Sequence, residues 1–234
     1  MKVGIIQSNF IPWRGYFDVI DEVDVFVLHD DLQYTKNDWR NRNRIKTDRG
    51  PAWLTVPVHY ANRAQLIQDT TIDYAQPWVA KHINLLRQWY RPAPHFAAYA
   101  ENFFPLLQQT YGSISELNRT LLRWAMDHLG IRTPLRLSSE LQVSGAKTER
   151  LIAMLTRLGA TTYLSGPAAQ DYLDLTLFRA HGIRLEFKTY DYAPYPQLGP
   201  DFAPAVSILD LLFNTGPDAR QHLKSRTSAI VAVP

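Results

Sequence analysis

Two short apolar segments near the start of the chain are each followed by polar side chains that could take part in chemistry. The segments are residues 3–6 and residues 25–28. The side chains that follow them carry amide, imidazole or carboxylate groups: Gln7, Asn9, His29, Asp30, Asp31 and Gln33. Amides orient substrates through hydrogen bonds, and an imidazole or a carboxylate can transfer protons near neutral pH. The pattern therefore indicates a ligand site with acid–base chemistry.

The two apolar segments have the composition of buried β-strands, and the amphipathic segment between them is long enough for a crossover helix. This order is typical of a parallel sheet, whose ligands bind outside the carboxyl ends of the strands. We therefore expect the amides of Gln7, Asn9 and Gln33 to orient a substrate at that edge. His29 or Asp31 would transfer the proton.

Strand alternation puts His29 and Asp31 on one face and Asp30 on the other. The two carboxylates could instead hold Mg²⁺ close to substrate phosphates, and Mg²⁺ is the one cofactor that the sequence suggests. Because adjacent Asp residues are common in loops, we favour proton transfer over a metal site. In a purely structural interpretation, Asp30 and Asp31 form a turn and His29 is a partly buried strand residue.

The loop after the first strand, residues 8–16, is rich in aromatic side chains. Trp13 and Tyr16 could stack on a ligand that Gln7 and Asn9 orient. Equally, Asn9 could cap the next helix while both aromatic rings fill the edge of the core.

Residues 40–47 and 53–58 resemble the two arms of a β-hairpin around a Gly-Pro turn. In an extended first arm, one face carries four cations: Arg40, Arg42, Arg44 and Lys46. The opposite face carries Trp39, Asn41, Asn43 and Ile45. A row of like charges repels itself unless an anion or solvent screens it, so we expect this arm to bind substrate phosphate.

Three residues of that arm carry the expected phosphate contacts: Arg40, Arg42 and Lys46. Trp39 and Asn41 complete its expected substrate-binding set. A solvated hairpin face is the structural alternative. Single-stranded nucleic acid is a further alternative, since basic and aromatic side chains alternate, but the basic density is confined to one hairpin.

The second half of the chain adds two smaller groups of candidates. Ser165 and Gly166 follow an apolar segment, where backbone N–H groups could bind an anion or a sugar hydroxyl. Tyr195 and Gln197 lie in a Pro- and Tyr-rich loop that could cover the site. A plain strand-to-helix turn and an ordinary surface loop are the alternatives.

Several of these segments, in this order, resemble the WbqC-like family. The resemblance rests on Gln7 to Phe17, Asp31, Gln33, Trp39 to Arg42, Ile45-Lys46, Trp53 to Pro57, Lys147-Thr148, Arg150-Leu151, Tyr163 to Gly166, Tyr195 to Gln197, and Ser207 to Asn214 with Gly216. It spans nearly the whole chain. The family is associated with bacterial O-antigen and polysaccharide gene clusters, which implies an enzyme of lipopolysaccharide or other surface-polysaccharide biosynthesis.

On this basis we expect a transferase or modifying enzyme that acts on a nucleotide-linked or phosphorylated sugar as its small-molecule substrate. A non-catalytic module that binds a carbohydrate or a partner is the alternative. The opening of the chain also resembles, loosely, the nucleotidylyltransferase-like α/β fold. Its first loop lacks the His-x-x-His or His-x-Gly-His motif of those enzymes, which argues against nucleotidyl transfer.

The remaining patterns predict an α/β fold with a mostly parallel sheet, flanking helices and a helical insertion. Helical periodicity dominates residues 77–130, and strand–helix alternation returns after residue 133. Further strands are expected at 133–137, 161–164 and 183–188, and one helix at 168–181. We expect residues 1–234 to form a single domain.

Composition excludes several classes of protein. The chain of 234 residues has no cysteine, which excludes disulfides and thiolate chemistry. No apolar stretch approaches the roughly 18–20 residues of a membrane span. The net charge of +3 is too small by itself to indicate a nucleic-acid partner. A cytoplasmic location is the natural expectation.

Overall fold

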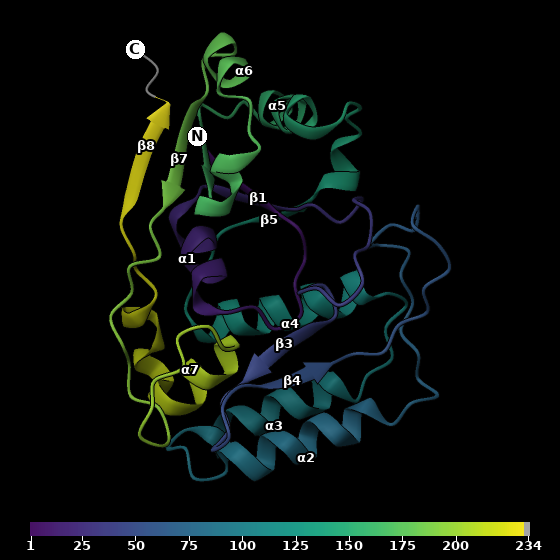
Figure 1. Cartoon of the computed structure of the whole chain (residues 1–234), viewed down its shortest axis with the longest axis vertical. Helices are drawn as coiled ribbons and strands as arrows, with labels where there is room; N and C mark the ends of the chain where they lie inside the picture. Colours follow the sequence, from purple (N-terminus) through teal and green to yellow (C-terminus); the bar gives the residue numbers. More distant parts are fainter. Residues whose placement is uncertain (232–234) are drawn as a thin grey trace.

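Six strands form one sheet in the computed structural model, which describes residues 1–231 (Figure 1). They are β1 (Lys2–Ile6), β2 (Val25–Leu28), β5 (Leu135–Leu137), β6 (Thr162–Ser165), β7 (Arg184–Lys188) and β8 (Thr227–Val231). Their order across the sheet is β5-β2-β1-β6-β7-β8. Neighbouring strands are parallel, except that β8 runs antiparallel to β7. The predicted fold class, a mostly parallel α/β sheet, is confirmed.

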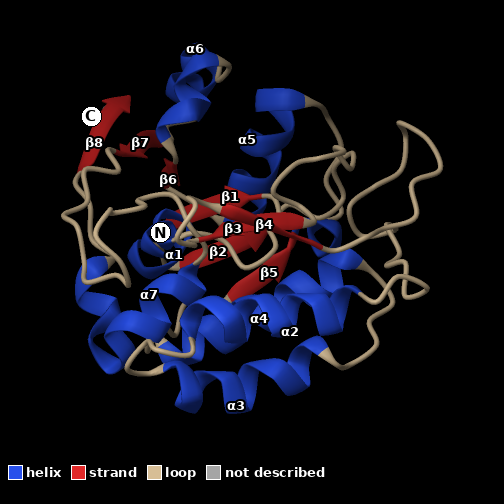
Figure 2. Ribbon diagram, turned by 60° about the horizontal axis from the view of Figure 1, so that its bottom comes forward, coloured by secondary structure: helices blue, strands red, loops and turns tan. Residues whose placement is uncertain are grey.

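Helices cover both faces of this sheet (Figure 2). α5 (Lys147–Leu158) and α6 (Leu175–Ala180) pack on one face, and α1 (Arg14–Glu22), α4 (Ile114–His128) and α7 (Ile208–Thr215) pack on the other. Because side chains alternate along each strand, the strands contribute apolar residues to the hydrophobic cluster on each face of the sheet. On β2, Val27 packs with the α5 group, whereas Phe26 and Leu28 pack with the α1 group.

A β-hairpin and two further helices enlarge the α1 side of the molecule. They are β3 (Arg42–Ile45), β4 (Ala52–Thr55), α2 (Trp78–Tyr90) and α3 (Phe96–Leu107). Ile45, Leu54 and the apolar faces of α2 to α4 belong to the same hydrophobic cluster as α1 and β2. The expected antiparallel hairpin near residues 40–58 is confirmed. That residues 77–130 are an insertion into a single domain stays a prediction.

Short 3₁₀ helices follow three elements, at Ser138–Leu141, Pro167–Asp171 and Gly216–His222. The second of these corrects the expectation of one helix over residues 168–181. The chain there forms a 3₁₀ turn and then α6, because the Asp174 side chain accepts hydrogen bonds from the N–H groups of Thr176 and Leu177 and so starts a new helix. The C-terminal strand β8 is not predicted by the sequence pattern.

Helix length sets one limit on the molecule. No helix within residues 1–231 is long and apolar enough to cross a membrane.

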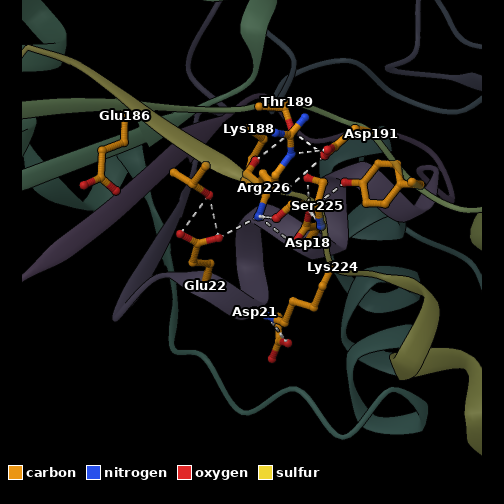
Figure 3. Close-up of polar contacts among 12 residues, drawn as sticks. Asp18, Asp21, Glu22, Glu186, Lys188, Thr189, Asp191, Lys224, Ser225 and Arg226 are labelled. Carbon is orange, nitrogen blue, oxygen red and sulfur yellow. Dashed lines mark hydrogen bonds and ion pairs between the residues drawn. The ribbon is translucent and has the colours of Figure 1, made fainter.

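A buried ionic network joins the first helix to the last strands (Figure 3). The fully buried Lys188 ammonium lies 2.9 Å from Asp18 Oδ1 and 2.6 Å from Glu22 Oε2. Asp18 Oδ2 accepts hydrogen bonds from the Tyr192 hydroxyl at 2.7 Å and the Ser225 hydroxyl at 2.6 Å. Since a charge without its partner is costly to bury, these groups hold α1, β7 and residues 189–227 together.

We predict that Lys188→Met destabilises the fold by about 3 to 5 kcal/mol, because it leaves Asp18 buried without its cation. Lys224→Met is a matched control. The Lys224 ammonium pairs with Asp21 at 2.8 Å, but the Lys224 side chain is 55% exposed. The control should cost less than about 1 kcal/mol. Urea denaturation measures both values, and equal losses would contradict the assignment.

Candidate functional site

The largest cavity beside the sheet, about 1000 Å³, opens at the carboxyl ends of its central strands. We call it the edge cavity. Its lining includes Gln7 after β1, His29 after β2, and Ser165 and Gly166 after β6. β1 and β6 are also where the sheet changes winding direction, since β2 and β5 lie on one side and β7 on the other. Such switch points are the usual ligand sites of open parallel sheets.

The start of helix α5 faces this cavity. Gly145 to Thr148 line it, and the N-cap residue Ala146 supplies no side-chain hydrogen bond. The first N–H groups of an uncapped helix can bind an anion, and the helix dipole favours negative charge there. Lys147 adds a positive side chain and has no ion-pair partner within residues 1–231. Its φ of +50° is rare outside glycine, and such backbone is often found at functional sites.

His29 lies in the wall of the edge cavity with only 7% of its surface exposed. Its Nε2 has no hydrogen-bond partner among the described residues and lies 3.8 Å from Asp31 Oδ1. The pKa of His29 is lowered to about 4, mainly by burial; the Asp31 carboxylate raises it and the Arg150 cation lowers it, and both effects are included in that value. The imidazole is therefore neutral at pH 7.

Asp31 and Asp30 are both engaged by residues from other elements. Asp31 forms an ion pair with Arg150 of α5 and accepts a 2.6 Å hydrogen bond from the Ser138 hydroxyl. Asp30 accepts hydrogen bonds from the Ser139 hydroxyl and N–H at 3.3 and 3.4 Å. Asp31 thus fixes Arg150 beside the cavity and is poorly placed to act as a free base.

These contacts bear on the Mg²⁺ expected as a possible cofactor. Both carboxylates already have hydroxyl or guanidinium partners. No group of three or more His, Asp or Glu residues in the described chain is arranged to hold a metal ion. The described residues therefore form no ready cluster for Mg²⁺, and Mg²⁺ held by one carboxylate and a substrate phosphate stays a prediction.

Gly166 allows an aromatic side chain to close one side of the cavity. A Cβ at Gly166 would lie 2.6 Å from the Tyr190 hydroxyl, so only glycine permits this approach. The Tyr190 ring in turn contacts Trp13 edge-on, with ring centroids 4.9 Å apart. Tyr190 has a φ of +56°, a second strained backbone position at the cavity.

Trp13 lines a second cavity of about 290 Å³, which we call the hairpin cavity. Its lining joins the β1 loop to the hairpin: Asn9, Pro12, Trp13, Trp39, Asn43, Arg44 and Ala205. Gln7 of the edge cavity and Asn9 of the hairpin cavity are two residues apart in the chain. The loop after β1 therefore contributes to both cavities.

The structure corrects the expected row of four cations. β3 begins only at Arg42, so Arg40 does not share its face. Trp39, expected on the opposite face, also precedes the strand and lies with Arg44, whose guanidinium is 5.6 Å from the Trp39 ring centroid. Arg40 is 7% exposed, donates a hydrogen bond to Asn9 Oδ1 and pairs with Asp38 at 3.5 Å. The Asp38 carboxylate compensates the charge of Arg40, and the hydrogen bond to Asn9 holds the β1 loop against the start of the hairpin. Arg42 and Arg44 do alternate as expected, with Asn43 and Ile45 buried between and beyond them.

Lys46 lines a third cavity of about 590 Å³ together with Asp210, and Tyr195 and Gln197 are bonded to that Asp210 without lining the cavity themselves. The buried Asp210 carboxylate accepts hydrogen bonds from Tyr195 at 2.8 Å and from Gln197 at 2.7 Å. A further bond comes from the Tyr90 hydroxyl at 2.7 Å. Neither the edge cavity nor the hairpin cavity includes these three candidates.

Three other candidates lie apart from the cavities. Tyr16 is buried, and its hydroxyl donates a 2.9 Å hydrogen bond to the Gln7 carbonyl. Asn41 is buried and donates to the Val56 carbonyl at 2.8 Å. Gln33 is exposed and forms an isolated bridge with Leu66.

The structure also adds residues that the sequence did not single out as site residues. Arg150 and Tyr190 line the edge cavity, and Ser138 and Ser139 bind the carboxylates beside it. One signal could have found the serines: they directly follow the strand 135–137, whose carboxyl end must meet the same sheet edge.

We predict that the His29 ring titrates near pH 4, as followed by its NMR ring signals in a pH series. Arg150→Gln should raise this pKa toward the ordinary value of 6.5, because it removes a nearby positive charge. Asp31→Asn should lower it further. A wild-type midpoint near 6.5 would show that the imidazole is solvated instead of buried.

Comparison with known proteins agrees with the order of motifs. Residues 7–222 match the model of the WbqC-like protein family. The "Uncharacterized protein Rv1507c" of Mycobacterium tuberculosis is 47% identical over 226 residues, which cover 95% of this chain and 97% of that relative. No solved structure matches the chain significantly. From this match over most of its length, the chain belongs to the WbqC-like protein family.

Proposed function

We propose that this protein is an enzyme of bacterial surface-polysaccharide biosynthesis that transfers to, or modifies, a nucleotide-linked or phosphorylated sugar. The family resemblance supports the polysaccharide role. One observation carries the chemistry: the uncapped start of α5 lines the same cavity of about 1000 Å³ as the neutral His29, whose Nε2 has no hydrogen-bond partner within residues 1–231. A phosphate-bearing sugar would use both.

The phosphate would bind at the first turn of α5. Backbone N–H groups there point along the helix axis, and Lys147 supplies a neutralising charge. Ser165 and Gly166 on the neighbouring strand end offer a hydroxyl and accessible backbone for the sugar. In this arrangement the donor phosphate contacts α5 and not the hairpin arginines.

His29 would accept the proton in the transfer step. In that step a hydroxyl oxygen of the acceptor forms the new bond and its proton passes to His29 Nε2. The electron pair of the broken bond leaves with the phosphate group. An imidazole with a pKa of about 4 is a weak base, but the negative charge of a bound phosphate would raise its pKa toward neutral.

Asp31 would act as a positioning residue in this scheme. Its carboxylate holds Arg150 through an ion pair, and Ser138 holds the carboxylate. Arg150 then presents its remaining N–H groups at the cavity wall.

A test is calorimetric titration with a panel of nucleotide-linked sugars, UDP-glucose and GDP-mannose among them. We predict that Lys147→Met weakens binding roughly tenfold, the loss expected for one charge-assisted phosphate contact. Lys81→Met, on an exposed face of α2, is the matched control and should bind like the wild type. The proposal fails if no sugar nucleotide binds, or if both lysine variants lose affinity equally.

Turnover separates the enzyme from a binding module. His29→Gln should keep the affinity within about threefold but slow release of the nucleoside phosphate by roughly 10²–10⁴ fold. Binding without release in the wild-type protein would instead favour the non-catalytic alternative.

A further inference from the structure

Two exposed tryptophans and two half-buried arginines form a surface at the hairpin. Trp39 and Trp53 are 37% and 43% exposed, and their ring centroids lie 5.5 Å apart. The Arg42 guanidinium lies 4.2 Å from the centroid of Trp53, and that of Arg44 lies 5.6 Å from both rings. We call these four residues the hairpin platform.

The platform carries uncompensated positive charge. Arg42 and Arg44 each donate a hydrogen bond to a backbone carbonyl, of Asn37 and Ala205 respectively. Neither guanidinium has a carboxylate partner within the described part of the chain, unlike Arg40 beside them. Two neighbouring cations without an acid attract an anion, and their stacking on indole rings fixes their direction.

The platform also exposes the apolar surface of two large aromatic side chains, Trp39 and Trp53, to solvent. Large aromatic side chains are seldom left exposed in pairs, and such surfaces mark binding sites. It continues into the hairpin cavity, since Trp39 and Arg44 line that cavity together with Asn9 and Asn43. An occupant would therefore meet indole faces, guanidinium groups and a small polar recess.

We propose that the hairpin platform binds a phosphate-bearing saccharide, the acceptor of the reaction. This inference rests on the proposed function of the edge cavity. A pyranose ring carries C–H groups on its faces and hydroxyls on its rim, so it can pack on Trp39 and Trp53 while its phosphate meets Arg42 and Arg44.

The geometry favours a saccharide over a nucleic-acid strand. Strand-binding proteins use a row of separate aromatic platforms along a basic groove. Here the two indoles contact each other, and the recess beside them holds only about 290 Å³. That space suits a single small ring.

The position of the platform suits an acceptor. Trp13 lines the hairpin cavity and contacts Tyr190, which lines the edge cavity. One aromatic contact thus separates the proposed donor and acceptor sites.

The test follows the indole N–H signals of ¹⁵N-labelled protein by NMR, with glucose 1-phosphate as the probe. Signals of Trp39 and Trp53, assigned from their Phe variants, should shift, whereas that of the buried Trp124 should stay. Glucose alone and inorganic phosphate alone should each bind at least roughly tenfold more weakly, because each makes only part of the contacts.

Arginine variants decide which charges matter. Arg42→Gln should raise the dissociation constant of glucose 1-phosphate roughly tenfold. Arg49→Gln, in the turn of the same hairpin with a 92% exposed side chain, should change it less than about twofold. The proposal is overturned if the two variants have equal effects, or if inorganic phosphate alone binds as tightly as glucose 1-phosphate. It is also overturned if the indole signals shift only with a ten-nucleotide oligothymidylate.

The two sites can fail separately. If Lys147→Met leaves nucleotide-sugar binding intact while Arg42→Gln weakens glucose 1-phosphate, the platform stands and the edge-cavity assignment falls. If instead Lys147→Met weakens nucleotide-sugar binding while Arg42→Gln leaves glucose 1-phosphate binding unchanged, the platform assignment is wrong and the edge-cavity assignment stands.

Discussion

Strand β1 is hydrogen-bonded to a parallel strand on each side, to β2 and to β6, and this double pairing determines where a ligand can bind. After β1 the chain passes to α1 on one face, and after β6 it passes to α6 on the opposite face. The two connecting segments therefore diverge at adjacent strand ends. The edge cavity lies in the gap between them, and α5, which leads into β6, places its uncapped first turn there.

The buried ionic network extends this constraint to the far end of the chain. On β7, Leu185 and Phe187 pack toward the α5 side, while Lys188 points to the acidic side of α1. The Lys188 and Tyr192 contacts with Asp18 anchor the chain on both sides of Tyr190. That anchoring accounts for the strained φ of Tyr190 and for its position over Gly166, since a free loop would relax.

Much of this arrangement follows from local sequence. Short β-branched segments predict the strands, and a parallel sheet must bring the polar residues after them to one edge, as it does for Gln7, His29 and Ser165. Alternation along an extended arm correctly separates Arg42 and Arg44 from the buried Asn43 and Ile45, because side chains of a strand point to opposite faces in turn.

What the sequence by itself determined is thus the strand and helix order and the edge at which polar groups gather. Only the tertiary structure decided which of those groups are free. Arg40 is paired with the Asp38 carboxylate and hydrogen-bonded to Asn9, Lys46 lies with Asp210 at another cavity, and Arg150 meets Asp31 across 119 positions. The physical reason is that a long charged side chain takes its partner from whatever the fold brings near, and that partner sets its charge and burial.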